Sequence, residues 1–152
     1  MKESNQLGFM TELQCQKDFT KYGILLSQPI MADSKYDFIA DINGKLYKIQ
    51  CKSSVIAEDG SFIRFKCCMT DIKHGRTYYT EEDVDYFYTC YNDKSYLVPI
   101  NIGGKAEKTL RFSALQNHAN IIWAKDYTLE NQLSILGYDY KSNEYQQTIT
   151  KG

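Results

Sequence analysis

The dipeptide Asn43-Gly44 stands between two stretches, 36–42 and 45–53, in which apolar and polar residues alternate. Such alternation is typical of a half-buried β-strand. An Asn-Gly pair between two strands predicts a two-residue type I′ turn, because both turn residues need positive φ and these residue types adopt it most readily. The stretch is therefore predicted to fold as a tight hairpin.

The turn also determines which residues of the hairpin face each other. Ile42 pairs with Lys45, and counting outward places Asp37 directly opposite Gln50. Lys52 lies two residues further along the same face, within reach of both side chains. A carboxylate, an amide and an ammonium are thus predicted to gather on one face. The alternative is that they form the solvated face of an ordinary hairpin.

The other face of the hairpin is apolar and is predicted to pack in the core. Its members are Phe38, Ala40, Ile42, Tyr47, Ile49 and Cys51.

A helix is predicted from 4 to 22, ended by Gly23. On a helical wheel, one arc is apolar, and it consists of Phe9, Leu13, Cys15, Phe19 and Tyr22. Glu12 falls near the middle of this arc. Because an unpaired buried charge is costly, Glu12 either extends to solvent, pairs with a lysine or has another specific cationic counterpart.

The remaining elements follow from alternation and turn signals. A capping pattern, Thr80 followed by Asp83, predicts the start of a helix, and Asn92-Asp93 predicts the turn of a second hairpin. The predicted strands are 24–30, 61–68, 85–91, 94–100, 107–113 and 120–124, with a loop over 69–80 and a helix over 128–136. The order of these elements indicates one α/β sandwich around a mixed sheet.

Length and composition exclude several classes of protein. The 152 residues have the size of one domain. Five cysteines, an odd number without a C-x-x-C pair, argue against a disulfide framework and a thiolate zinc site. No apolar run is long enough to span a membrane and the N-terminus lacks the apolar core of a signal peptide, so a cytoplasmic location is predicted. The isolated Gly103-Gly104 pair gives no support for a nucleotide cofactor.

Charge is unevenly distributed along the chain, although the net charge is only -1. Between 43 and 76 there are seven basic and three acidic residues, and between 77 and 100 there are five acidic residues against Lys94 alone. A basic segment beside an acidic one allows one-sided attraction to a polyanion.

Taken together, a helical Glu, an Asp about 25 residues later and Gln-x-Lys on the paired strand resemble the PD-(D/E)xK nuclease superfamily. The segments that carry the resemblance are "TELQCQKDF", "KYDFIADINGKLYKIQCKSS" and "YTEEDVDYFYTCYNDKSYLVPI", within residues 5–113. They are most similar to the branch that contains group I intron-encoded homing endonucleases. Tyr36 replaces the Pro of the motif. Gln50 replaces its acid, as this branch is expected to show.

The resemblance implies a restriction-endonuclease-like fold, a mixed β-sheet with a central β-hairpin flanked by helices. It also implies a single nuclease domain over 1–152, with a catalytic core of about 5–113 and a C-terminal extension of about 114–152. The implied catalytic residues are Glu12, Asp37, Gln50 and Lys52. The first three would bind Mg²⁺, or Mn²⁺ in its place, through oxygen atoms. Lys52 would stabilise the transition state of phosphodiester hydrolysis.

Double-stranded DNA is the implied partner. The residues predicted to contact it are Ser53, Arg64, Lys66, Lys73, His74, Arg76, Lys105, Lys108 and Arg111. Because one active site cuts one strand, a double-strand break requires a homo-oligomer, dimer or tetramer, and the tail after Ala114 is a candidate for subunit contacts. Two alternatives stay open: a structure-specific nuclease such as a Holliday-junction resolvase, and a catalytically inactive DNA-binding module with the same fold.

Overall fold

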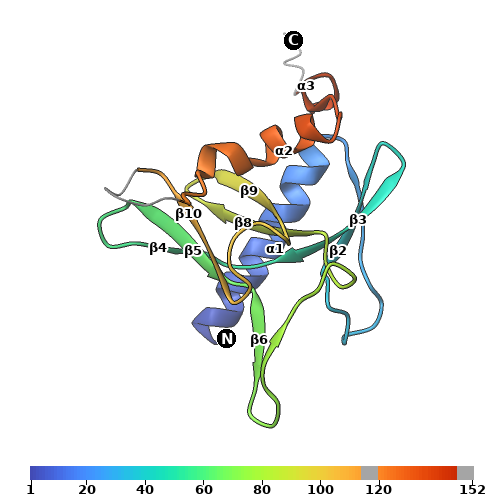
Figure 1. The fold of residues 1–152 in the computed structure, drawn as a ribbon. Coiled ribbons are helices and arrows are strands. Elements are labelled where there is room, and N and C mark those ends of the chain that lie inside the picture. Colours follow the sequence, from blue (N-terminus) through green and yellow to red (C-terminus); the bar gives the residue numbers. More distant parts are fainter. Residues whose placement is uncertain (114–119, 147–152) are drawn as a thin grey trace.

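The computed structural model describes residues 1–113 and 120–146. Their elements are arranged as a sandwich of helices and sheets (Figure 1). In chain order they are α1 (Glu3–Lys21), β1 (Leu25–Ser27), β2 (Phe38–Ile42), β3 (Lys45–Cys51), β4 (Val55–Ile56), β5 (Phe62–Lys66), β6 (Cys68–Asp71), β7 (Gly75–Tyr78), β8 (Tyr86–Tyr91), β9 (Lys94–Pro99), β10 (Glu107–Arg111), the 3-10 helix η1 (Ala124–Tyr127), α2 (Leu129–Ile135) and α3 (Tyr140–Asn143).

A five-stranded sheet of order β1-β2-β3-β8-β9 forms the centre of the molecule. β2 and β3 form the predicted hairpin, in which Ile42 pairs with Lys45 and Phe38 with Ile49. β3 runs parallel to β8, whereas the other neighbouring strands are antiparallel, so the sheet is mixed as predicted.

The predicted turn geometries are confirmed at both hairpins. Asn43 and Gly44 have φ values of 55° and 81°, and Asn92 and Asp93 have φ values of 52° and 63°. Positive φ at both central residues is the mark of the type I′ turn, whose twist matches that of the strands it joins.

The central sheet separates two hydrophobic cores. One lies between the sheet and helices α1 and α2, and the other lies between the sheet and a small sheet of order β10-β5-β4 (Figure 1). All of the hairpin residues predicted to face the core belong to the first one, where Ala40 and Ile49 are fully buried and Tyr47 is half-buried. Removing these apolar surfaces from water is the main source of the fold's stability.

Helix α1 has the predicted length, but its inner face is rotated from the predicted one. The buried residues are Thr11, Cys15 and Phe19, followed by Tyr22 just beyond the helix. Phe9 and Leu13, which were expected in the core, are 59% and 48% exposed. The helix buries the stripe that starts at Thr11, because its hydroxyl is satisfied by the carbonyl of Leu7 (3.0 Å) and by Ser53 (2.9 Å).

Two local predictions between 68 and 85 are wrong. Residues 69–80 are not a plain loop, because β6 and β7 pair as an antiparallel hairpin that projects away from the sheets (Figure 1). No helix starts at Thr80. The backbone N–H groups of Asp83 and Val84 donate to Thr80 O, which closes a single turn, and the chain then enters β8. The capping pattern of Thr80 and Asp83 is present, but the residues that follow it offer no apolar face whose packing would stabilise a helix.

The C-terminal part of the described chain contributes to both cores: Ile122, Ala124 and Tyr127 belong to the second core, and helix α2 belongs to the first. Helix α2 forms as predicted, with Leu129 and Leu133 fully buried. Instead of the strand predicted over 120–124, an isolated bridge joins Trp123 to Arg111. The contribution of the tail to subunit contacts stays a prediction, and 114–119 and 147–152 lie outside the described residues.

Candidate active site

The four predicted catalytic residues line one hollow beside the N-terminal half of α1. Glu12 comes from the helix, Asp37 precedes β2, and Gln50 and Lys52 come from β3 and its C-terminal end. The hollow has a volume of about 420 Å³, and its other lining residues are Ser4, Asn5, Gly8, Phe9, Cys51 and Ser53. A helix and a hairpin that are separate in the sequence therefore present their polar groups to the same space.

Asp37 is held in place by the backbone of β3. Its N–H donates to Ile49 O (2.9 Å), and its Oδ2 accepts the N–H of Cys51 (2.8 Å). These two bonds extend the β2–β3 ladder by one residue and orient the carboxylate beside Gln50. The position of Asp37 thus follows from the register that the Asn-Gly turn imposes.

Glu12 lies on α1 next to Asp37, at the edge of the buried face. Burial, the negative charge of Asp37 and a hydrogen bond between the two carboxyl groups raise the pKa of Glu12 from 4.5 to about 7. The neighbouring Thr11 hydroxyl, 2.9 Å from Ser53 Oγ, ties this turn of the helix to the end of β3. Two acidic groups are therefore held close together.

Gln50 and Lys52 complete the hollow from the side of β3. The amide nitrogen of Gln50 lies 3.4 Å from Cys51 O, so its carbonyl oxygen is the atom available to a cation. Lys52 donates its backbone N–H to Tyr88 O (2.9 Å), and its ammonium lies 3.3 Å from the hydroxyl of Tyr79.

These donors fit a hard divalent cation. No group of three His, Cys, Asp or Glu side chains that could hold a metal occurs in the described residues. The hollow instead offers two carboxylates and one amide, which are all oxygen donors of the kind that Mg²⁺ and Mn²⁺ accept. Burial and the neighbouring charge of Asp37 disfavour the ionised form of Glu12, and a cation bound between the two carboxyl groups would favour it.

The proximity of the two carboxyl groups predicts a pH-dependent loss of stability. Since the pKa of Glu12 is 4.5 ordinarily and about 7 in the folded protein, the folded state keeps a proton that the unfolded state has released in this interval. The contribution of Glu12 to stability should fall from pH 4.5 to 7 and then level off. Glu12→Gln should remove this fall and make the protein more stable at pH 8, by about 1 kcal/mol after solvent screening.

Urea unfolding of both proteins between pH 4 and 8 measures the difference. Adding Mg²⁺ at pH 8 should stabilise the wild type more than the Glu12→Gln variant. A constant difference between the two proteins at all pH values would contradict the close approach of the two carboxyl groups.

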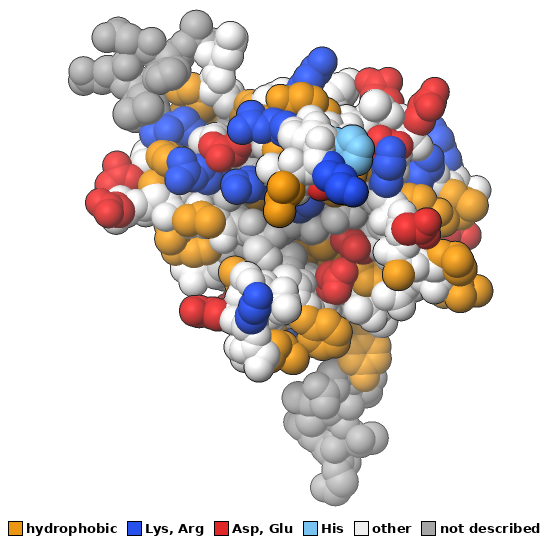
Figure 2. Space-filling model, turned by 90° about the horizontal axis from the view of Figure 1, so that it is seen from below, with side chains coloured by type: hydrophobic (Ala, Val, Ile, Leu, Met, Phe, Trp, Pro, Cys, Tyr) orange, Lys and Arg blue, Asp and Glu red, His pale blue; other side chains and the backbone are white. Residues whose placement is uncertain are grey.

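Three of the residues predicted to contact DNA lie on the projecting β6–β7 hairpin, namely Lys73, His74 and Arg76. All three are exposed, and His74 Nδ1 contacts Asp71 Oδ2 at 2.8 Å. Seen from the side of this hairpin, Lys and Arg side chains gather in a band across the molecule (Figure 2). An exposed two-stranded ribbon with basic side chains has the shape that the major groove of DNA admits.

The other predicted contacts are divided between the surface and the interior. Lys66 and Lys105 are exposed. Arg64 is also exposed, and its Nη1 lies 3.9 Å from Glu107 Oε1 on the neighbouring strand of the small sheet. Ser53 lines the hollow beside Lys52.

Lys108 is incompatible with the predicted contact to DNA, because its side chain is only 1% exposed. The ammonium donates to the carbonyls of Ile100 (2.9 Å), Gly104 (3.1 Å) and Ile102. Burial lowers its pKa. Lys108 lies on the inner face of β10, as Leu110 does. Its three hydrogen bonds hold the loop that precedes the strand.

Lys108→Met is therefore expected to destabilise the fold by about 3 kcal/mol, because three carbonyl groups lose their donor. Chemical denaturation measures the change, and Lys66→Met on the adjacent strand is the control, since Lys66 is exposed. Equal stability of the two variants would show that water replaces the ammonium at no cost.

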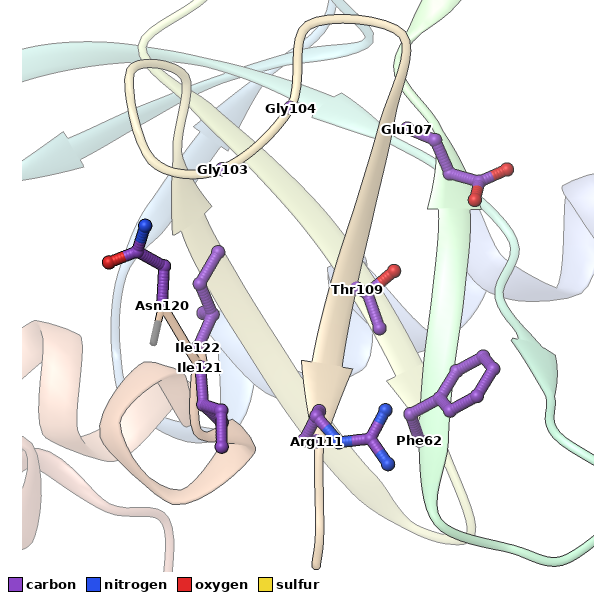
Figure 3. A pocket seen from close by; sticks show the side chains of 9 residues that line it. All are labelled: Phe62, Gly103, Gly104, Glu107, Thr109, Arg111, Asn120, Ile121 and Ile122. Carbon is purple, nitrogen blue, oxygen red and sulfur yellow. The ribbon is translucent and has the colours of Figure 1, made fainter. Parts of the chain in front are cut away.

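A second hollow, also of about 420 Å³, shares no lining residue with the first and lies between β10, the loop at Gly103-Gly104 and residues 120–122 (Figure 3). Arg111 lies there, with its guanidinium over the ring of Phe62 (5.2 Å) and its Nε donating to Ser113 O (3.0 Å). This second hollow is lined by one carboxylate, that of Glu107, whereas two line the first.

Sequence reasoning missed two residues of the site. Thr11 could have been found, because it is four residues before Cys15 and eight before Phe19 on the helix. No local sequence pattern indicates that Tyr79 belongs near the site. Its contact with Lys52 depends on how the β6–β7 hairpin returns to the central sheet.

Comparison with known proteins identifies the family. The chain matches the model of the PD-(D/E)XK endonuclease family over residues 2–130. It therefore belongs to this family and is a nuclease, as the motif around the hairpin predicted. PD-(D/E)XK nucleases act on DNA and generally use divalent metals.

The structure of a bacterial homing endonuclease is similar in fold. The TM-score is 0.70 at 18% sequence identity, and the match covers 90% of this chain and 95% of that chain. The predicted fold class is confirmed by these two findings. No curated protein matches the chain. None of the helices in 1–113 and 120–146 has the length and apolar character that crossing a membrane requires.

Proposed function

We propose that this nuclease is a sequence-specific, Mg²⁺-dependent DNA endonuclease of the homing type, which makes a double-strand break. The observation that carries the proposal is the close pair of Glu12 and Asp37, with Gln50 and Lys52 at the same hollow. The homing type is supported by the similar fold of the bacterial homing endonuclease and by Gln in place of the motif's acid.

The residues of the hollow would have different roles in phosphodiester hydrolysis. When bound, a divalent cation lowers the pKa of its water and polarises the phosphate. Glu12, Asp37 and the carbonyl of Gln50 would hold it. Lys52 offers the positive charge that stabilises the oxygen atoms of the phosphate as the transition state forms, and it orients the attacking water. Ser53, beside Lys52, is placed to contact the same phosphate.

The β6–β7 hairpin is proposed as the element that positions the duplex. Its exposed basic side chains at Lys73 and Arg76 would contact phosphates or guanine edges. Replacing both by Gln should lower the salt dependence of duplex binding, by about 0.9 in the slope of log K against log salt for each lost phosphate contact. Fluorescence anisotropy at several salt concentrations measures the slope.

The control for the hairpin variant replaces Lys94 and Lys141 by Gln, since both are exposed and lie on other parts of the surface. An unchanged slope in the hairpin variant, or an equal loss in the control, would remove the hairpin from the proposed DNA-binding surface.

A double-strand break requires two such chains, so we propose that the enzyme acts as a homo-oligomer. Helix α1 supplies a candidate contact surface, because Met10 and Leu13 are 58% and 48% exposed there. Exposed apolar side chains that adjoin one another are common in protein interfaces.

The proposed function is tested by offering the protein a randomised linear duplex library and a four-way junction, each with and without Mg²⁺. Cutting of both strands at one preferred linear sequence, only with Mg²⁺, is the expected result. Cutting confined to the junction would replace the proposal by a structure-specific resolvase. Duplex binding without strand scission under any condition would indicate an inactive recognition module, which Gln50 in place of an acid would then explain.

A further inference from the structure

The ammonium of Lys52 contacts a tyrosine hydroxyl instead of an acid. Within residues 1–113 and 120–146, no carboxylate oxygen lies within 4.0 Å of Lys52 Nζ. The ammonium lies 5.1 Å from the centre of the Tyr79 ring and 3.3 Å from the Tyr79 hydroxyl. Glu12 and Asp37 line the same hollow and are not paired with it.

This arrangement keeps two opposite charges apart in one site. An ion pair between Lys52 and either carboxylate would neutralise both the metal-binding group and the catalytic cation. The neutral hydroxyl of Tyr79 can accept a hydrogen bond from the ammonium without cancelling its charge. A lysine side chain has several rotatable bonds, so a fixed position for its tip requires such a partner.

Tyr79 is itself held rigidly. Its ring packs edge-on against Phe87, with ring centres 5.5 Å apart and an angle of 78° between the planes. Phe87 is 1% exposed and belongs to the second core. Tyr79 directly follows β7, the second strand of the projecting hairpin, so it lies where the hairpin joins the body of the protein.

We propose that Tyr79 is a positioning residue for Lys52, which holds the ammonium near the scissile phosphate and away from the metal-binding carboxylates. This inference rests on the proposed nuclease mechanism. It adds that the hairpin which meets the duplex and the lysine which serves the reaction are joined through one aromatic side chain.

The test compares Tyr79→Phe and Tyr79→Leu with the wild type. Phe loses only the hydroxyl and keeps the packing of the ring against Phe87, whereas Leu loses both. In single-turnover cleavage of a supercoiled plasmid carrying the preferred site, with Mg²⁺ and saturating protein, Tyr79→Leu should cut about tenfold more slowly. Tyr79→Phe should lose most of the same factor, because it also lacks the hydroxyl, while its thermal stability stays close to that of the wild type. Duplex affinity, measured by anisotropy with Ca²⁺ in place of Mg²⁺, should change in neither variant.

Tyr47→Leu is the matched control. Tyr47 is also half-buried, it lies edge-on against Tyr86 (5.7 Å), and the ammonium of Lys45 lies 5.3 Å from its ring centre. It lies on β3 and packs against the first core, and it does not line the hollow, so its replacement reproduces the packing loss away from the site. Its cleavage rate should equal that of the wild type.

The outcomes separate the inference from the function on which it rests. No cleavage by the wild type would overturn the proposed function, and the role of Tyr79 with it. Cleavage by the wild type with an equal rate in Tyr79→Leu would overturn the role of Tyr79 alone. An equal loss of rate in Tyr47→Leu and Tyr79→Leu, tracking a common loss of thermal stability, would reduce Tyr79 to a packing residue.

Discussion

Asp37→Asn is expected to abolish DNA cleavage, with a fall in rate of about 10³-fold or more. The substitution removes one of the two carboxylates that face each other in the hollow, and an amide is a much weaker ligand for Mg²⁺. The side chain keeps an oxygen that can accept the N–H of Cys51, so the fold should persist. Cleavage of the preferred duplex and unfolding by urea measure the two effects.

Asp41→Asn is the control for this variant. Asp41 lies on β2, which Asp37 precedes, and it also accepts one backbone N–H, from Gly44 at 3.0 Å, but it lies at the far end of the hairpin. Its cleavage rate should be that of the wild type. If Asp37→Asn still cuts at more than a tenth of the wild-type rate, the metal site has been placed wrongly.

The loss of Asp37 should also change Glu12. Because the charge of Asp37 contributes to the raised pKa of Glu12, Asp37→Asn should lower that pKa from about 7 toward its ordinary value. Titration of the Glu12 carboxyl by NMR gives a readout that is independent of activity. An unchanged pKa would mean that burial alone sets it.

Lys52→Met is expected to slow cleavage by about 10²- to 10³-fold without weakening metal binding. Methionine has a similar length and keeps the apolar contacts of the stem, so the loss reports mainly the ammonium. Isothermal titration with Mn²⁺ should show metal affinity close to that of the wild type, whereas Asp37→Asn should show little binding. The two variants therefore divide the hollow into a metal-binding part and a charge-stabilising part.

Lys45→Met is the control for the lysine, since Lys45 is exposed and its ammonium also lies over a tyrosine ring, that of Tyr47. Loss of metal binding in Lys52→Met would show that the ammonium organises the metal-binding residues, and its separate role in the transition state would be withdrawn.

The hairpin that carries Asp37 and Gln50 could be predicted from the sequence because its geometry is local. An Asn-Gly turn determines φ at two residues, and the two-residue period of a strand then assigns every side chain to a face. The same local reasoning placed the second hairpin around Asn92-Asp93 and ended the first helix at Gly23.

Two of the predictions that were wrong are that of Lys108 as a surface residue and that of the buried face of α1. The alternation in β10 puts Lys108 on the same face as Leu110, and applying it would have excluded Lys108 from the surface. On α1 the apolar arc predicted the wrong buried face, because the helix exposes Phe9 and buries Thr11. Thr11 can be buried because its hydroxyl is hydrogen-bonded to Leu7 O and Ser53.

What the sequence determined by itself is thus the hairpin, its register and the nuclease motif, since each depends on residues close together along the chain. Only the tertiary structure decided that β3 runs parallel to β8, that Glu12 approaches Asp37, and that Tyr79 meets Lys52. Those contacts join segments about 25 residues apart or more. They form because two cores on opposite faces of one sheet position the helix and the projecting hairpin.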